Sequence, residues 1–580
     1  MPSRDGPVHV ATTTRSYKGK VYKTHLLRRS YREDGKVKNE TVGNLSHLPD
    51  SVIELIKTAL KGEVLTPATE TFEAISSYHH GHVQAVLAAM KGLEFASLLD
   101  SHPSRERSLV MGMVAARILN ADSKLATTRW WHVTTLSQEL GIGDATEDDL
   151  YAAMDWLIER QDAIEKRLGK RHLFKGCLVL YDLSSTYVEG SRCPLAFLDH
   201  NRDGKKGKLQ INFGLLADSR GCPVSVTVYP GNTGDSTTLL GQVTVLQDMF
   251  GIERIALTGD RGMISQKQIN DLRDIDGVDW ITALKTPQIS KLMGQGYVQL
   301  GLFDDRNLFE FTHPDFPGER LIACRNPESA KLRAHKRRDL LAATVRELEK
   351  VERIVASGKL KDDGAIGVRV GKVVNRYKVG KHIDYEIQDR SFTFSVNEGR
   401  VAEEAALDGI YVIRTSLPAE VMGTDDAVRN YKNLASVERA FRSMKTMDLH
   451  VRPIYHHLED RVRANIFLCM LAYYVEWHIF QAWREITLAD EDQEAKKTRD
   501  PVAPAKRSEG ALAKVQERKL DDGTIAASFR TMLSDLSGIV RNVCRRKGAS
   551  HKEPTFTVTT TPSPLQRRAL ALVEGIVIAK

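Results

Sequence analysis

Residues 177–182 read CLVLYD, an apolar run that ends in a carboxylate. Two further apolar runs follow along the chain, LQINFGLLAD over 209–218 and CPVSVTVYPG over 222–231. Apolar runs of this length, bounded by turn residues, are typical of buried strands. They predict three consecutive strands of one sheet.

Helical and strand patterns alternate after these three strands. A helical pattern covers residues 236–250, and the apolar run RIALTGD follows over 254–260. A second helical pattern covers 266–272, and the apolar run WITAL follows over 280–284. The resulting order, βββαβαβ, predicts an α/β domain with a mixed sheet, and we place its first part over 174–285.

The core pattern is interrupted over 286–424, where we expect an insertion domain. Its first half holds a helical pattern that opens with five cations, Lys331, Arg333, Lys336, Arg337 and Arg338. Apolar and polar residues then alternate over 383–396 as in a β-hairpin. The basic helix fits a DNA contact and a solvated surface equally well.

Helical patterns over 425–446 and 458–483 resume the core after the insertion. We place the second part of the core over 425–485.

The amino-terminal segment carries most of the excess positive charge. The chain has 83 Lys and Arg against 75 Asp and Glu, a net charge of +8. Residues 1–45 alone hold ten of these cations and four of the acids. Strand-like stretches around the turn at Asp34-Gly35 predict a basic, β-rich module over 1–50. Its cations, Arg28 and Arg29 among them, fit either a grip on DNA phosphates or an ordinary solvated surface.

Two other regions flank the core. Helical spacing over 51–173 predicts a helical region, to which we assign DNA binding or dimerisation. It contains the sequence YHHGH over 78–82, but no Cys or carboxylate accompanies these histidines at ligand spacing, so surface or helix-start histidines are favoured over a metal site. At the other end, the aperiodic, proline-containing stretch 490–507 predicts a flexible linker, and 486–580 as a whole a linker and tail with a short helix.

Composition excludes several classes of protein. With 42% hydrophobic residues, 41 Gly and 19 Pro in 580 residues, the chain is neither disordered nor collagen-like. Its six Cys include no CxxC pair, which favours reduced thiols in the cytoplasm. The most apolar stretch is well short of the roughly 20 residues of a membrane span, and neither GxxxxGK[ST] nor GxGxxG occurs. We therefore expect no membrane crossing, no export and no nucleotide cofactor.

Two aspartates are candidates for chemistry because of where they stand. Asp182 and Asp260 each follow an apolar run, and open α/β sheets place their active sites at strand ends. An aspartate in this position often caps the next element instead, so each alone is a weak signal.

A glutamate in the later helical pattern strengthens this interpretation. Glu438 lies in YKNLASVERAFRSMK over 431–445, and at about 100° per residue it falls within about 60° of Tyr431, Leu434 and Lys445 on one helix face. If this helix packs beside the two strand ends, three carboxylates converge and require cations such as Mg²⁺ or Mn²⁺. A pair of such ions about 4 Å apart suits in-line attack on a phosphodiester. The alternative is a solvated glutamate beside Arg439 and Arg442.

At these residues the chain resembles the DDE transposases of bacterial insertion sequences, specifically the insertion-sequence-four superfamily with its Y-(2)-R-(3)-E-(6)-K signature. Tyr431, Glu438 and Lys445 match this signature at the required spacing. Leu434 stands where the signature has Arg, and Lys432 or Arg439 is a candidate substitute. The stretches YDLSSTYVEG, YPGNTGD and TGDRGM, which begin at residues 181, 229 and 258, also resemble the family.

The resemblance implies a fold and a site. The fold is an RNase H-like mixed-sheet catalytic domain with a β-rich insertion, together with the basic amino-terminal module and a helical domain. Asp182, Asp260 and Glu438 would be catalytic ligands of two Mg²⁺ ions, for which Mn²⁺ can substitute. Tyr431 and Lys445 would hold DNA phosphates near the cut, with Arg439 and Arg442 as further candidate DNA contacts.

It also implies an activity and partners. The activity is that of a bacterial transposase that cleaves terminal inverted repeats and joins their 3′ ends to target DNA. Such a protein would act in the cytoplasm at the nucleoid, as a homodimer on double-stranded DNA. Two alternatives stay open: an RNase H-like nuclease that cuts without joining, and a catalytically inactive, transposase-derived DNA-binding protein.

Overall fold

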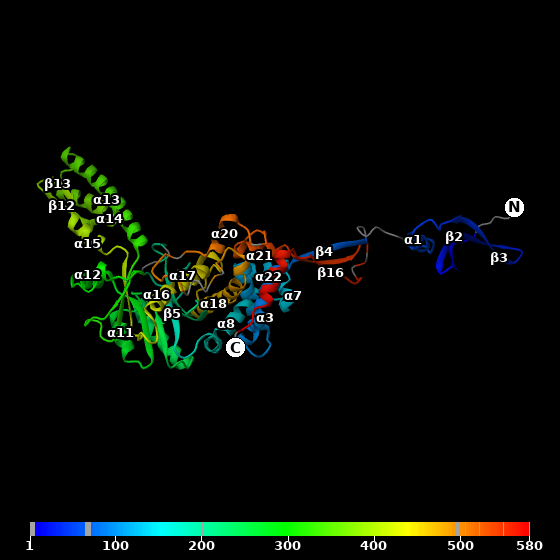
Figure 1. Ribbon diagram of the computed structural model, residues 1–580, viewed down its shortest axis with the longest axis horizontal. Helices are drawn as coiled ribbons and strands as arrows, with labels where there is room; N and C mark the ends of the chain where they lie inside the picture. Colours follow the sequence, from blue (N-terminus) through cyan, green and yellow to red (C-terminus); the bar gives the residue numbers. More distant parts are fainter. Residues whose placement is uncertain are drawn as a thin grey trace. The chain divides into compact units, whose positions relative to one another are not determined.

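The structure, a computed structural model, describes residues 6–63, 71–199, 202, 204–490, 492, 498–504, 506–520, 522–548, 550 and 552–578. The chain divides into two units, Met1–Ser77 with Arg541–Thr559 and Tyr78–Val540 with Thr560–Lys580 (Figure 1). Among the described residues, no helix combines the length and the apolar composition that a membrane span requires.

The first unit contains the basic β-rich module. Strands β1 (Val8–Tyr17), β2 (Lys20–Glu33) and β3 (Lys36–Asn44) form an antiparallel sheet with β2 in the centre, and α1 (Asp50–Leu60) follows. Both residues of each hairpin turn, Lys18-Gly19 and Asp34-Gly35, have positive φ angles. Such two-residue turns match the twist of the flanking strands, so the local sequence determines the pairing.

A second sheet of three strands joins distant parts of the chain. Its order is β16 (Phe556–Thr559), β15 (Val540–Arg546) and β4 (Phe72–His79). Our helical prediction over 51–173 was therefore wrong for residues 72–79. The partner strand of β4 lies more than 450 residues away in the sequence, so helical periodicity in the surrounding segment gave no indication of it.

The mixed sheet of the second unit has eight strands in the order β10-β11-β14-β9-β8-β5-β6-β7. Strands β5, β8 and β9 run parallel, and the other neighbours pair antiparallel. The bounds of the five strands predicted from sequence are β5 (Cys177–Tyr187), β6 (Gln210–Asp218), β7 (Pro223–Pro230), β8 (Ile255–Thr258) and β9 (Val278–Ala283). The predicted βββαβαβ order is confirmed, with α10 (Leu239–Thr244) and α11 (Gln266–Arg273) as its helices.

The first strand is longer than predicted. Asp182 does not end it, because β5 continues to Tyr187. Its antiparallel neighbour β6 continues as well, so that Asp182 lies opposite Leu215 and Thr186 lies opposite Ile211. The parallel partner β8 ends much earlier, opposite Leu180.

The helical region and the sheet share one hydrophobic core. The helices of this region are α3 (Gly81–Gly92), α4 (Phe95–Leu99), α5 (Arg105–Leu119), α6 (Lys124–Trp130), α7 (Leu136–Leu140), α8 (Glu147–Ile158) and α9 (Gln161–His172). The long helix α18 (Glu459–Ala482) is buried along most of its length and packs against α5, α8 and β7. From α3 onwards, the predicted helical region thus forms a single body with the catalytic core around α18.

The insertion is smaller and more helical than predicted. Strands β10 (Leu308–Phe311), β11 (Arg320–Arg325) and β14 (Ile410–Thr415) belong to the core sheet. The remainder consists of α13 (Pro327–Ala356), α14 (Asp363–Tyr377), the hairpin of β12 (Ile383–Gln388) and β13 (Ser391–Val396), and α15 (Glu398–Ala406). Helices α13 and α14 pack side by side (Figure 1) around apolar residues that include Leu348, Val351 and Ile366. The same cluster includes Ile383 and Phe392 of the hairpin, so the insertion has a hydrophobic core of its own.

The carboxyl-terminal segment is part of the fold and not a tail. It forms α20 (Glu509–Glu517), α21 (Phe529–Ser537), β15, β16 and α22 (Pro564–Glu574). Helix α22 packs against α3, and Trp483 Nε1 donates a hydrogen bond to Ala569 O at 2.9 Å. The predicted linker over 490–507 lies partly outside the described residues. Within its described part, Val502 is buried in the core.

Candidate active site

The parallel pair β5 and β8 brings Asp182 and Asp260 to one level of the sheet. Leu180 lies opposite Thr258, and each aspartate stands two residues further along. Asp260 belongs to the turn after β8, where its Oδ1 accepts hydrogen bonds from the backbone N–H groups of Gly262 at 2.8 Å and Met263 at 2.7 Å. These two bonds fix the orientation of the carboxylate.

Glu438 comes to the same region on helix α17 (Leu434–Arg442), which packs against β5. Val437, Ala440 and Phe441 are buried under this helix, while Glu438 is exposed. The Phe441 ring meets the ring of Phe213 on β6 edge to face, with 5.3 Å between the centroids. The buried face therefore determines which way Glu438 points.

The signature segment is not one straight helix. The predicted helix over 425–446 is divided into α16 (Thr424–Lys432), α17 and a π-helical turn over Ser443–Met447. The break lies at Asn433, which caps both helices. We placed Tyr431, Leu434, Glu438 and Lys445 on one face by assuming about 100° per residue throughout. Because the helix is interrupted, the angles between these residues that we calculated are wrong.

The charges of the three carboxylates interact. Burial raises the pKa of Asp182 to about 7, and the nearby charges of Asp260 and Glu438 also raise it, against the hydrogen bond from the Leu183 N–H group. No salt bridge joins any of the three to a described Lys, Arg or His. Carboxylate oxygens that repel one another and form no salt bridge are a donor set that suits a hard divalent cation.

The carboxylates do not surround a single point. The ligand atoms of Asp182, Asp260 and Glu438 do not all lie within 4.8 Å of one another. Among the described residues, the group that meets this distance is His172, Cys222 and His478. Two ions about 3.5–4 Å apart are held by carboxylates around two centres, which is a wider arrangement than ligands around one ion.

The group of His172, Cys222 and His478 is a weaker candidate for a metal. Tyr474 Oη lies 3.1 Å from His172 Nε2, and Arg220 Nη2 lies 3.3 Å from His172 Nδ1. Both ring nitrogens are thus engaged, one of them by a cation. The group comes from α9, the β6–β7 turn and α18, so no sequence spacing could have indicated it.

The two other signature residues lie beside the carboxylates. Lys445 Nζ donates a hydrogen bond of 3.0 Å to Ser184 Oγ, two residues after Asp182 on the same face of β5. Burial raises the pKa of Tyr431 to about 12, and the charges of Asp260 and Glu438 contribute. Leu434, which replaces the signature Arg, packs against the hydrophobic core.

Arg202 is a cation of this region that the sequence interpretation missed. Its guanidinium donates to the backbone carbonyl of Leu183 and pairs with Asp235, and its charge lowers the pKa of Asp182. A signal was present, because Arg202 opens a run of cations over 202–208 directly before β6, within the region of the quoted motifs.

The other predicted DNA contacts are dispersed. Arg439 and Arg442 are exposed on α17, as are Lys331, Arg333 and Lys336 on α13. Arg337 differs, because it forms a salt bridge with Asp408 in which both side chains are largely buried. It is thus held within the insertion, and its role as a DNA contact stays a prediction. Arg28 and Arg29 are half-buried on β2 in the first unit.

The histidines over 78–82 have structural roles. His79 Nδ1 lies 2.9 Å from Ser537 O, and His80 Nδ1 lies 2.9 Å from Thr135 Oγ1. Burial lowers the pKa of His82 to about 4. His80 directly precedes α3, which agrees with the expected helix-start position, but His80 and His82 are buried and not on the surface.

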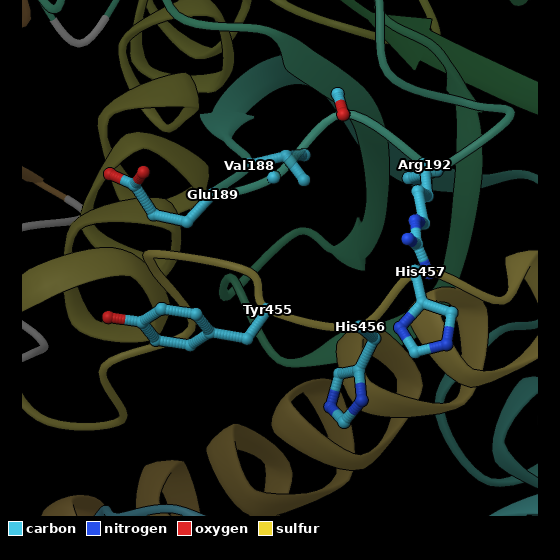
Figure 2. Close-up of a pocket in the computed structure, with 9 residues that line it drawn as sticks. Val188, Glu189, Arg192, Tyr455, His456 and His457 are labelled. Atoms are coloured by element: carbon cyan, nitrogen blue, oxygen red, sulfur yellow. The ribbon is translucent and has the colours of Figure 1, made fainter.

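A small cavity lies beyond the carboxylates at the end of β5. Its volume is about 280 Å³, and it is lined by residues 188–193 and 455–457. In Figure 2 the Arg192 side chain extends towards His457 on one side of the view, and Glu189 and Tyr455 lie on the other. The segment 455–457 is held there because Ile454 N donates to Tyr187 O at 3.1 Å.

Two family models match the chain. The model described as the IS1634 family transposase N-terminal domain matches residues 10–69, and that of the transposase DDE domain matches residues 174–475, which is more than half of the 580 residues. No curated protein matches the chain.

One solved structure similar to the chain is a piggyBac transposase in a cryo-EM structure of its synaptic complex with hairpin DNA. The sequence identity is 9%, the TM-score is 0.34, and the match covers 68% of this chain and 75% of that chain. A similarity this weak carries no argument about fold or function.

Proposed function

The chain belongs to the DDE transposases of insertion sequences, and on this premise we propose that it is an active enzyme. It binds the terminal inverted repeats of its element, cleaves the 3′ ends and joins them to target DNA. The observation that carries the proposal is the approach of Asp182, Asp260 and Glu438, which come from three distant segments, interact through their charges and form no salt bridge with a described Lys, Arg or His.

The three carboxylates would hold the metal. Asp182 and Asp260 are fixed by the sheet and by the turn after β8, and Glu438 by the packing of α17. When bound, a pair of Mg²⁺ or Mn²⁺ ions would activate the attacking water or 3′ hydroxyl and stabilise the leaving oxygen. The raised pKa of Asp182 fits this assignment, because a divalent cation favours the ionised form that burial opposes.

Cations near the carboxylates would position the DNA. Lys445 is oriented by Ser184, and Arg202 is anchored on the Leu183 carbonyl. Each can bind a phosphate oxygen and so hold the scissile bond against the carboxylates. The dimer on DNA and the cytoplasmic location that the resemblance implies stay predictions.

The test uses the DNA that flanks the gene as substrate. Asp182→Asn, Asp260→Asn and Glu438→Gln should each reduce cleavage at least about a thousandfold while DNA binding stays within a few fold, because each removes a metal ligand and little volume. Asp248→Asn is the matched control, since Asp248 is exposed in the turn Val245–Met249 and is not one of the site residues, and it should cleave like the parent. Cleavage retained in any of the three variants would remove that residue from the site.

Strand transfer decides between a transposase and a nuclease. Pre-cleaved ends incubated with a supercoiled plasmid should give joined products in the presence of Mg²⁺. Cleaved ends without any joined product would favour the nuclease, and the absence of both reactions in the parent chain would favour the inactive DNA-binding protein.

A further inference from the structure

Two buried cations line a cavity between the helices of the second unit. The cavity has a volume of about 440 Å³ and lies among α5, α6, α8, α18 and the segment 450–458. Arg117 on α5 is 9% exposed and Lys124 at the start of α6 is 5% exposed. Charged side chains are seldom this deeply buried unless an opposite charge accompanies them.

Neither cation has a carboxylate partner among the described residues. Lys124 Nζ and Arg117 Nη2 donate to the same neutral atom, Asn465 Oδ1, at 3.4 and 3.3 Å. Arg117 Nη1 donates to the carbonyl of Leu449 at 3.4 Å. All three contacts are longer than a usual hydrogen bond of about 2.9 Å. Two like charges thus share one weak acceptor, and most of their donor capacity is unused.

The buried cations of the cavity repel one another, and the pKa values of the basic groups around them reflect this. Burial and the charge of Arg117 lower the pKa of Lys124 to about 7. Burial and the charges of Lys124 and Arg117 lower the pKa of His456 to about 3. Arg461 also lines the cavity, paired with Asp155 at 3.2 Å, and the acidic residue of the lining is the exposed Asp122. An anion between the cations would relieve this repulsion.

We propose that this cavity binds a phosphate group through Arg117 and Lys124. The planar fork of arginine with an adjacent ammonium matches the several oxygens of a phosphate. The volume falls in the range of about 300–1,000 Å³ typical of ligand sites, so the phosphate can carry a sugar and a base. The rings of Tyr151 and His456, 6.0 Å apart, supply an apolar wall for them.

The cavity adjoins the segment that leads from the catalytic helix to α18. Glu189 N, beyond the end of β5, donates to Ile454 O at 2.8 Å, so the wall of the cavity is fastened to the strand that carries Asp182. His456 and His457 line both this cavity and the smaller one in Figure 2. The phosphate site goes beyond the proposed function and does not depend on it.

The first test measures binding of inorganic phosphate to the full chain by calorimetry, with sodium chloride at equal ionic strength as the reference. Lys124→Met should weaken phosphate binding at least about tenfold, because it removes a desolvated charge. The same variant without phosphate should melt at or above the parent temperature, since a buried unpaired charge is gone. Lys166→Met, which removes an exposed lysine from α9, is the control and should bind like the parent.

A second measurement does not depend on a variant. Crystals of the parent grown with tungstate, a heavy analogue of phosphate, should show tungsten within hydrogen-bonding distance of Arg117 and Lys124. Parent protein that binds phosphate no better than chloride, equal affinity in Lys124→Met, or tungstate bound only elsewhere would each overturn the proposal.

The source of the phosphate is decided by competition with DNA. If a DNA strand supplies the group, a short duplex of the element end should displace phosphate, and Lys124→Met should lower the salt slope of DNA binding by about one unit. If a free phosphate or nucleotide supplies it, the duplex should leave phosphate affinity unchanged. Both results support the site, because each requires the cavity to hold a phosphate group.

Discussion

Glu165→Gln should make helix α9 more stable at neutral and alkaline pH. Glu165 is 3% exposed and fastens α9 to strand β7. Its Oε1 accepts hydrogen bonds from Gln161 Nε2 at 2.7 Å and Val226 N at 3.1 Å, and its Oε2 accepts one from Ser225 Oγ at 2.7 Å. A glutamine can keep all three bonds, because the Ser225 hydroxyl can rotate and accept from the new amide.

The magnitude follows from the pKa of this carboxyl. Burial raises it from 4.5 to about 7, against the three hydrogen bonds, which lower it. Between pH 4.5 and 7 the unfolded chain releases this proton while the folded chain keeps it, so the folded state loses stability as pH rises through this window. At about 1.4 kcal/mol per pKa unit, the loss reaches about 3 kcal/mol above pH 7. The variant has no such loss.

The assay is amide hydrogen exchange of α9, which reports the free energy of opening this helix. From pH 5 to pH 8, the opening free energy of Glu165→Gln should rise by about 2.5 kcal/mol relative to the parent, because a small part of the loss has already occurred at pH 5. Glu159→Gln is the control, since that side chain is 73% exposed, and its difference from the parent should be flat. A difference for Glu165→Gln that is independent of pH would refute a carboxyl of raised pKa at this position.

Three further predictions concern the elements around the site. Gly221 has a φ of +85°, and a Cβ there would lie 2.6 Å from Ser436 Cβ on α17. Gly221→Ala should therefore lower the free energy of unfolding by about 2 kcal/mol and reduce cleavage by displacing α17. A melting temperature unchanged from the parent would contradict this. A chain that ends at residue 562 lacks α22, which leaves Trp483 Nε1 without its acceptor and exposes α3. Its soluble yield and its melting temperature should both fall. A truncated chain that melts like the parent would show that α22 is dispensable. Lys445→Ala should lower the salt slope of binding to the element ends by about one unit, measured by fluorescence anisotropy across a range of salt concentrations, and an unchanged slope would remove Lys445 from the phosphate contacts.

The sequence alone determined the central strands and the candidate carboxylates. Buried strands of a mixed sheet have long apolar runs that are visible without any partner, which is why the order from β5 to β9 could be predicted. The same runs located Asp182 and Asp260, and the spacing within 431–445 located Glu438. These features are encoded locally, by the residues of one element and its turn.

Tertiary structure decided which elements pair and which charges are buried. Strands β4 and β14 pair with strands far away in the sequence, so periodicity in their own neighbourhood did not assign them to a sheet. Arg337 and Lys124 look in the sequence like ordinary surface cations, yet one forms a largely buried salt bridge and the other lines a cavity. The burial of a charged side chain depends on what packs over it, and that is a property of the whole fold.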